Sequence, residues 1–163
     1  MSQKILVVDD SRTIRRVVDW VFHGSPYTVI PAATASEALQ LIRAERPDVA
    51  LIDYALPDSS GFDLCMELKT DADLDRIPLI MLAGNYAGPF DESRVAGCGA
   101  DDFIYKPFRT DALIEKVTTV VSKALSRPVQ FTPQQQDAAP STSHLRPISL
   151  DEAPDPMAPP SEA

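Results

Sequence analysis

The chain has 163 residues and carries 15 Lys and Arg against 24 Asp and Glu, a formal net charge of −9. This charge repels phosphate backbones and excludes general nucleic-acid binding, and no apolar run reaches the roughly 18–20 residues of a membrane span. Two cysteines are too few for a disulfide scaffold and the first residues do not resemble a signal peptide, so we expect a cytoplasmic protein.

Up to about residue 126, short apolar runs alternate with amphipathic stretches. The runs are rich in β-branched residues, which predicts strands, whereas apolar residues three and four apart predict helices. In chain order we expect strand 5–8, helix 11–22, strand 27–30, helix 36–46, strand 49–52, helix 61–69, strand 78–82, helix 92–96, strand 102–105 and helix 110–121. Ser11, Ser36 and Thr110 are the predicted N-caps of their helices.

Five strands that are apolar throughout and joined by helices predict a parallel sheet with helices on both faces, the doubly wound α/β class. In such a sheet, ligands bind beyond the carboxyl ends of the strands. Asp9 and Asp10 follow the first predicted strand, Asp53 follows the third, and Lys106 follows the fifth. The sequence therefore places three carboxylates and one ammonium group at one edge of the sheet.

This group of charges points to a cation and an anion that share one site. Three neighbouring carboxylates repel one another unless a cation neutralises them, and an all-oxygen site suits Mg²⁺. Lys106 offers a positive charge to a phosphoryl group, and a carboxylate can accept that group covalently. Asp53 lies alone on the central strand, so we expect it to be the nucleophile, with Asp9 and Asp10 as metal ligands.

Several motifs together carry a family resemblance. They are Ile5-Leu6-Val7-Val8-Asp9-Asp10-Ser11, then Leu51-Ile52-Asp53 with Pro57 and Gly61, then Gly99-Ala100-Asp101-Asp102-Phe103-Ile104-Tyr105-Lys106-Pro107-Phe108. In this order and spacing, residues 4 to about 124 resemble the receiver domain of bacterial response regulators, in particular the stand-alone receivers of chemotaxis. The resemblance implies a five-stranded sheet in the order 2-1-3-4-5.

The resemblance also implies a role for each site residue. A histidine kinase would donate a phosphoryl group to Asp53 in an Mg²⁺-dependent transfer. Asp10 would coordinate the metal directly and Asp9 partly through water. The backbone carbonyl of Ala55 would be a further protein ligand, and Lys106 would contact the phosphoryl group.

The chain departs from the family at its switch residues. The family usually has Thr or Ser at the end of the fourth strand, where this chain has Ala83, and the aromatic residue of the fifth strand is Phe103, which also lacks a hydroxyl. Besides a phosphorylatable receiver, a pseudo-receiver that binds partners without phosphate therefore stays open. An aspartate-nucleophile phosphohydrolase is disfavoured because Ala55, two residues after Asp53, supplies no general acid or base. We expect no enzyme.

Residues 127–163 differ in composition from the rest of the chain. They hold eight of the 15 prolines, and their large apolar residues are scattered singly. We therefore predict a receiver domain over residues 1–126 and a disordered, acidic tail over 127–163. The most apolar segment of the tail, residues 145–150, is either a binding motif or simply solvated chain. We expect no second folded domain. The resemblance therefore implies that the receiver passes its signal by binding a downstream protein partner on the face formed by residues 88–124.

Overall fold

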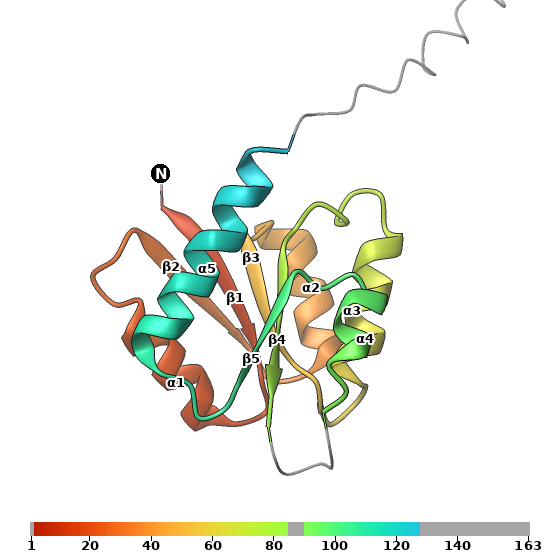
Figure 1. Cartoon of the computed structure of the whole chain (residues 1–163), viewed down its shortest axis with the longest axis horizontal. Helices are drawn as coiled ribbons and strands as arrows, with labels where there is room; N and C mark the ends of the chain where they lie inside the picture. Colours follow the sequence, from red (N-terminus) through yellow and green to blue (C-terminus); the bar gives the residue numbers. More distant parts are fainter. Residues whose placement is uncertain (1, 85–89, 128–163) are drawn as a thin grey trace, which may run out of the picture. The chain divides into compact units, whose positions relative to one another are not determined.

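The computed structural model describes residues 2–84 and 90–127, which form one sheet flanked by helices (Figure 1). The five strands are β1 (Gln3–Val8), β2 (Tyr27–Ala32), β3 (Val49–Asp53), β4 (Leu79–Ala83) and β5 (Asp102–Tyr105). They lie in the order β2-β1-β3-β4-β5, and every neighbouring pair is parallel. The predicted doubly wound sheet in the order 2-1-3-4-5 is confirmed.

Helices cover both faces of this sheet (Figure 1). They are α1 (Arg12–Val21), α2 (Ala35–Glu45), α3 (Gly61–Thr70), α4 (Ser93–Gly97) and α5 (Thr110–Leu125). Apolar residues of α1 and α5 pack into one core, and those of α2, α3 and α4 pack into the other. The fourth helix is short, with five residues, as its sequence predicts.

Successive residues of the inner strands alternate between the two cores. Ile5 and Val7 of β1 join the core of α1 and α5, whereas Leu6 and Val8 join the core of the other three helices. All residues of β3 and of β4 are buried. Because helices cover both faces, these strands are apolar throughout instead of alternating with polar residues.

Of the three predicted N-caps, Ser11 is confirmed, since its hydroxyl accepts a hydrogen bond of 3.3 Å from the N–H of Ile14. The prediction for Thr110 is wrong. Thr110 is the first residue of α5, and the residue before it, Arg109, caps the helix without a side-chain bond. Instead, the Asp111 carboxylate in the first turn accepts the N–H of Ala112 at 2.9 Å.

The predicted cap Ser36 is also wrong, because α2 begins before it. Thr34 is the N-cap, and its hydroxyl accepts the N–H of Glu37 at 3.1 Å. The N–H groups of Ala35 and Ser36 donate to the carboxylate of Asp58, at 2.9 and 3.0 Å. Asp58 lies between β3 and α3, so a tertiary contact satisfies the first turn and lets the helix start earlier.

Some predictions lie outside the described residues. The prediction of a disordered tail over residues 127–163 is one of them, since only Arg127 of this segment is described. The prediction for the segment 145–150 is another. Gly88 and Pro89, at the start of the predicted partner face, are the others. Among residues 2–84 and 90–127, no helix has the length and apolar character needed to cross a membrane.

Candidate functional site

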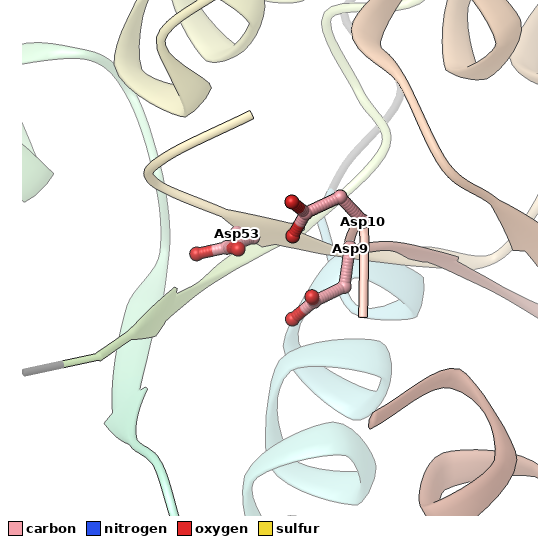
Figure 2. Close-up of side chains that lie close together, drawn as sticks. All are labelled: Asp9, Asp10 and Asp53. Atoms are coloured by element: carbon pink, nitrogen blue, oxygen red, sulfur yellow. The ribbon is translucent and has the colours of Figure 1, made fainter. Parts of the chain in front are cut away.

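Three aspartates gather where β1 and β3 end. Val8 of β1 lies beside Ile52 of β3 in a parallel register, so the residues that follow them emerge at the same edge of the sheet. One carboxylate oxygen from each of Asp9, Asp10 and Asp53 lies within 4.8 Å of the others (Figure 2). Asp9 is fully buried and Asp53 is 4% exposed, whereas Asp10 is exposed. Burial of two carboxylates is costly unless each has a partner.

Lys106 supplies that partner from the end of β5. Its Nζ donates to Asp9 Oδ2 at 2.9 Å and pairs with Asp53 Oδ2 at 3.3 Å. The backbone N–H of Lys106 donates to the carbonyl of Ala83 at 2.6 Å, which ties this residue to the end of β4. The Lys106–Pro107 peptide bond is cis. The structure thus brings all four charged residues of the predicted site together.

The local electrostatics favour an added cation. Burial, and after it the negative charge of Asp9, raise the pKa of Asp53, the positive charge of Lys106 lowers it, and the net result is a pKa of about 6. Burial lowers the pKa of Lys106, but its bond to Asp9 and the charge of Asp53 outweigh burial, so the pKa of Lys106 is raised. Three carboxylates face one ammonium group, so negative charge is in excess.

Besides Lys106, two contacts hold Asp9 in place. The N–H of Ser11 donates to Asp9 Oδ1 at 2.9 Å, so each carboxylate oxygen has a donor, with Lys106 on the other. A guanidinium nitrogen of Arg15 on α1 donates to the backbone carbonyl of Asp9 at 2.7 Å. The buried carboxylate is therefore fixed by hydrogen bonds from both its own turn and the first helix.

The aspartates line an open cleft of about 490 Å³. Its walls come from the ends of β1, β3, β4 and β5 and from the start of α1, and its lining residues are Asp9, Asp10, Ser11, Thr13, Ile14, Asp53, Tyr54, Ala55, Gly84, Lys106 and Pro107. The N–H of Ala55 donates to Asp53 Oδ1 at 3.3 Å. Among residues 2–84 and 90–127, the lining of the cleft offers carboxylate and carbonyl oxygens and no sulfur or imidazole ligand, a donor set that fits Mg²⁺.

The close approach of α3 to β3 shapes the floor of this site. A Cβ atom on Gly61 would overlap the carbonyl oxygen of Asp53 and lie 2.7 Å from the Cα of Tyr54. The N–H of Gly61 donates to the carbonyl of Tyr54 at 2.8 Å. Only glycine fits here, because the first residue of α3 lies directly on the backbone that carries Asp53.

The two predicted switch residues, Ala83 and Phe103, are not among the residues that line the cleft. Ala83 is fully buried at the end of β4, and its carbonyl accepts the N–H of Lys106. Phe103 is half-buried on β5, in ring contact with Phe90 and Tyr105 at 5.5 and 5.7 Å between centroids. Neither residue brings a hydroxyl group to the cleft.

Sequence reasoning missed three residues that organise this site. Tyr54 lines the cleft, Arg15 holds the carbonyl of Asp9, and Asp58 ties the segment after β3 to α2. The position of Tyr54 directly after Asp53 was a usable signal. Arg15 and Asp58 had none, because charged residues on an exposed helix or loop are common without a partner.

The raised pKa of Asp53 predicts a gain in stability when its charge is removed. The folded protein binds a proton at Asp53 more tightly than the unfolded chain, so this group destabilises the fold as pH rises from about 4 through 6. We expect metal-free Asp53→Asn to have a free energy of unfolding up to about 2–3 kcal/mol higher at pH 7. Urea unfolding at pH 7 and pH 4 measures the difference, most of which should be lost at pH 4, close to the unfolded pKa of 3.8. The exposed variant Asp73→Asn is the control and should show neither effect.

Comparison with known proteins links this geometry to one family. The profile of the response regulator receiver domain matches residues 5–118. A crystal structure of a CheY-like response regulator receiver domain protein from Methanospirillum hungatei has 31% identity and a TM-score of 0.68, and the match covers 77% of this chain and 98% of that one. The chemotaxis protein CheY4 of Vibrio cholerae has 28% identity and a TM-score of 0.67, over 74% of this chain and 99% of that one.

A longer relative also matches. It is a Guillardia theta protein described as "Probable transcriptional regulator ycf27", 34% identical over 126 residues. The match covers 75% of this chain and 46% of the relative, so the chain spans about half the length of that protein.

Proposed function

Because the chain belongs to the response regulator receiver domain family, we propose that it accepts a phosphoryl group on Asp53 from a histidine kinase and signals through protein–protein contact. The observation that carries this proposal is the pairing of a nearly buried Asp53 with Lys106 at 3.3 Å, beside Asp9 and Asp10. This arrangement offers a nucleophile, a cation for the transferred group and oxygen ligands for a metal within one cleft.

The transfer would begin with the ionised carboxylate of Asp53, which predominates above its pKa of about 6. A carboxylate oxygen forms a bond to phosphorus while the bond between phosphorus and the donor histidine nitrogen breaks, and that electron pair returns to the imidazole. The products are an acyl phosphate on Asp53 and, once the released imidazole nitrogen has taken up a proton from water, a neutral histidine. Asp9 holds the ammonium group of Lys106 at 2.9 Å. In this position the ammonium group would bind an oxygen of the transferred phosphoryl group.

The same cleft would hold Mg²⁺. Asp10 is the exposed carboxylate and would bind directly, Asp9 partly through water, and Asp53 with the backbone carbonyl of Ala55 would complete the protein ligands. When bound, the ion would supply positive charge to neutralise the phosphoryl oxygens and the crowded carboxylates.

A phosphorylation assay tests the proposal. The full chain is incubated with Mg²⁺ and a small acyl phosphate, and its mass is then measured. We expect one phosphoryl group on the wild type and on Asp73→Asn, whose exposed carboxylate is the matched control, and none on Asp53→Asn. Fragmentation of the adduct should assign the group to Asp53. A wild type without any adduct would contradict the proposal and favour a phosphate-independent interaction module, whereas continuous turnover of the acyl phosphate would indicate a phosphohydrolase.

The output would be a binding event and not a catalysed reaction. We propose that a downstream protein partner uses the face of residues 88–124, of which residues 90–124 are described. Ion pairs link its elements, such as Lys116 of α5 with Asp102 of β5 at 3.0 Å. The net charge of −9 argues against nucleic acid as the partner. We place the protein in the cytoplasm, where a histidine kinase domain would reach it.

The metal assignment predicts a specific response of Asp10→Asn. A ligand present at ten times its dissociation constant stabilises the folded state by about 1.4 kcal/mol. We expect Mg²⁺ to raise the melting temperature of the wild type, and to do so less in Asp10→Asn, which loses one charged ligand. The metal-free variant should melt slightly higher than the metal-free wild type, because one repelling carboxylate is gone. Thermal melts with and without Mg²⁺ measure both effects, and an unchanged Mg²⁺ response in the variant would contradict the assignment.

A further inference from the structure

Tyr54, the residue after Asp53, contacts both sides of the connection between β4 and α4. Its hydroxyl donates to the carbonyl of Gly84 at 3.1 Å, directly after β4. Its ring meets the ring of Phe90 edge-on at 5.3 Å between centroids, just before α4. One side chain therefore joins the backbone of the candidate phosphorylation site to the two described residues that lead from β4 into α4.

In the part of the chain that the structure describes, Phe90 is the centre of an aromatic cluster of five rings. The members of this aromatic cluster are Tyr54, Phe62, Phe90, Phe103 and Tyr105. Phe90 contacts each of the other four at centroid distances of 5.3 to 5.9 Å. Such ring pairs are favoured in these offset and edge-on geometries, so a displaced Phe90 would disturb all its partners.

The aromatic cluster reaches the protein surface at Tyr105. This residue is 45% exposed, and its hydroxyl donates to the carboxylate of Glu92, the N-cap residue of α4. The other end of the cluster lies in the cleft, which both Tyr54 and Gly84 line. The contacts thus run without a gap from the residue beside Asp53 to an exposed side chain on β5.

We propose that Tyr54 is the positioning residue that couples occupancy of the cleft to α4 and β5, through its hydrogen bond to Gly84 and its contact with Phe90. The inference rests on the proposed function, since the group that fills the cleft is the phosphoryl group on Asp53. Ala83 and Phe103 carry no hydroxyl, whereas Tyr54 brings one to the lining of the cleft.

The coupling has a simple physical cause. A phosphoryl oxygen is a charged acceptor, and hydrogen bonds to charged acceptors are roughly twice as strong as those to neutral carbonyls. Charge and volume added to Asp53 therefore act on both partners of the Tyr54–Gly84 hydrogen bond. A change in the Tyr54–Gly84 hydrogen bond shifts the Tyr54 side chain. Because the same side chain contacts Phe90, this shift also changes the position of Phe90. A ligand shifts an equilibrium only through such a difference between two states.

The test uses beryllofluoride with Mg²⁺ as a mimic of the phosphoryl group, read by amide NMR of the full chain. The amide of Ala55, bonded to Asp53, reports the cleft, and the amides of Val95 and Tyr105 report α4 and β5. In the wild type we expect all three to shift. In Tyr54→Phe, which keeps the ring, Ala55 should still shift. The equilibrium constant for the change at Val95 and Tyr105 should fall about 2–10-fold, the usual effect of one neutral hydrogen bond.

Tyr27→Phe is the matched control. Tyr27 is also in edge-on ring contact, with Phe22, but it belongs to the core of α1 and α5 on the other side of the sheet. Its response should equal that of the wild type. Full shifts at Val95 and Tyr105 in Tyr54→Phe would overturn the coupling while leaving the proposed function intact. No shift at Ala55 in the wild type would overturn the proposed function, and the coupling with it.

Discussion

Lys106→Met should destabilise the metal-free protein by about 3–5 kcal/mol at neutral pH, the usual cost of breaking a buried ion pair from one side. The Lys106 side chain is 14% exposed, and it is the ion-pair partner of both Asp9 and Asp53 among the described residues. Methionine keeps most of the apolar stem and removes the charge. Two nearly buried carboxylates would then face each other without a cation. Urea unfolding in the presence of a chelator measures the loss.

The loss should depend on pH with a definite sign. Without the ammonium group, the pKa of Asp53 rises above its value of about 6. The positive charge of Lys106 is the largest of the effects that lower this pKa, and the variant lacks it. The folded state then binds protons more tightly than the unfolded chain, so the variant should regain stability as pH falls from 7 towards 4. Added Mg²⁺ should restore part of the lost free energy of unfolding, because its positive charge also neutralises the carboxylates of the cleft.

The matched control is Lys116→Met. Lys116 forms the same kind of pair with Asp102 at 3.0 Å, but both side chains are about one-third exposed. Pairs at that exposure contribute ~0–1 kcal/mol. Equal, small losses in the two variants would show that the carboxylates of the cleft do not depend on Lys106.

Gly61→Ala should cost about 3 kcal/mol, at the upper end of typical overpacking effects. The added Cβ overlaps the carbonyl oxygen of Asp53, which is backbone and has no room to rotate away. The start of α3 would have to move off the end of β3, and the 2.8 Å hydrogen bond from Gly61 to Tyr54 would lengthen. The same movement displaces Asp53, so we also expect phosphorylation by a small acyl phosphate to slow.

Gly97→Ala is the matched control for backbone effects. Gly97 is the last residue of α4, and a Cβ there would meet no atom within 4 Å among the described residues outside its own helix. Alanine in a helix is favoured over glycine by up to about 1 kcal/mol, so this variant should be as stable as the wild type or more stable. If Gly61→Ala proves as stable as Gly97→Ala, the close approach of α3 to Asp53 is not a requirement of the fold.

The sequence by itself determined the sheet and the meeting of charges at its edge. The runs 5–8 and 49–52 are apolar at every position, which predicts a parallel strand covered on both faces, and the structure has this arrangement. Once strands are parallel, their carboxyl ends share one edge, so residues that follow different strands must converge. For this reason, local sequence patterns alone predict that Asp9, Asp53 and Lys106 lie at the same edge of the sheet.

The tertiary structure decided everything that depends on a partner far away in the chain. The start of α2 is set by Asp58, more than 20 residues later, and not by the nearby Ser36. Gly61 is required by the backbone of Asp53, and the pKa of Asp53 is set chiefly by burial. The contacts of Tyr54 with Gly84 and Phe90 likewise join segments some 30 residues apart. Local sequence records the period of an element and the chemistry of its side chains, but contact distances and burial exist only once the chain has packed.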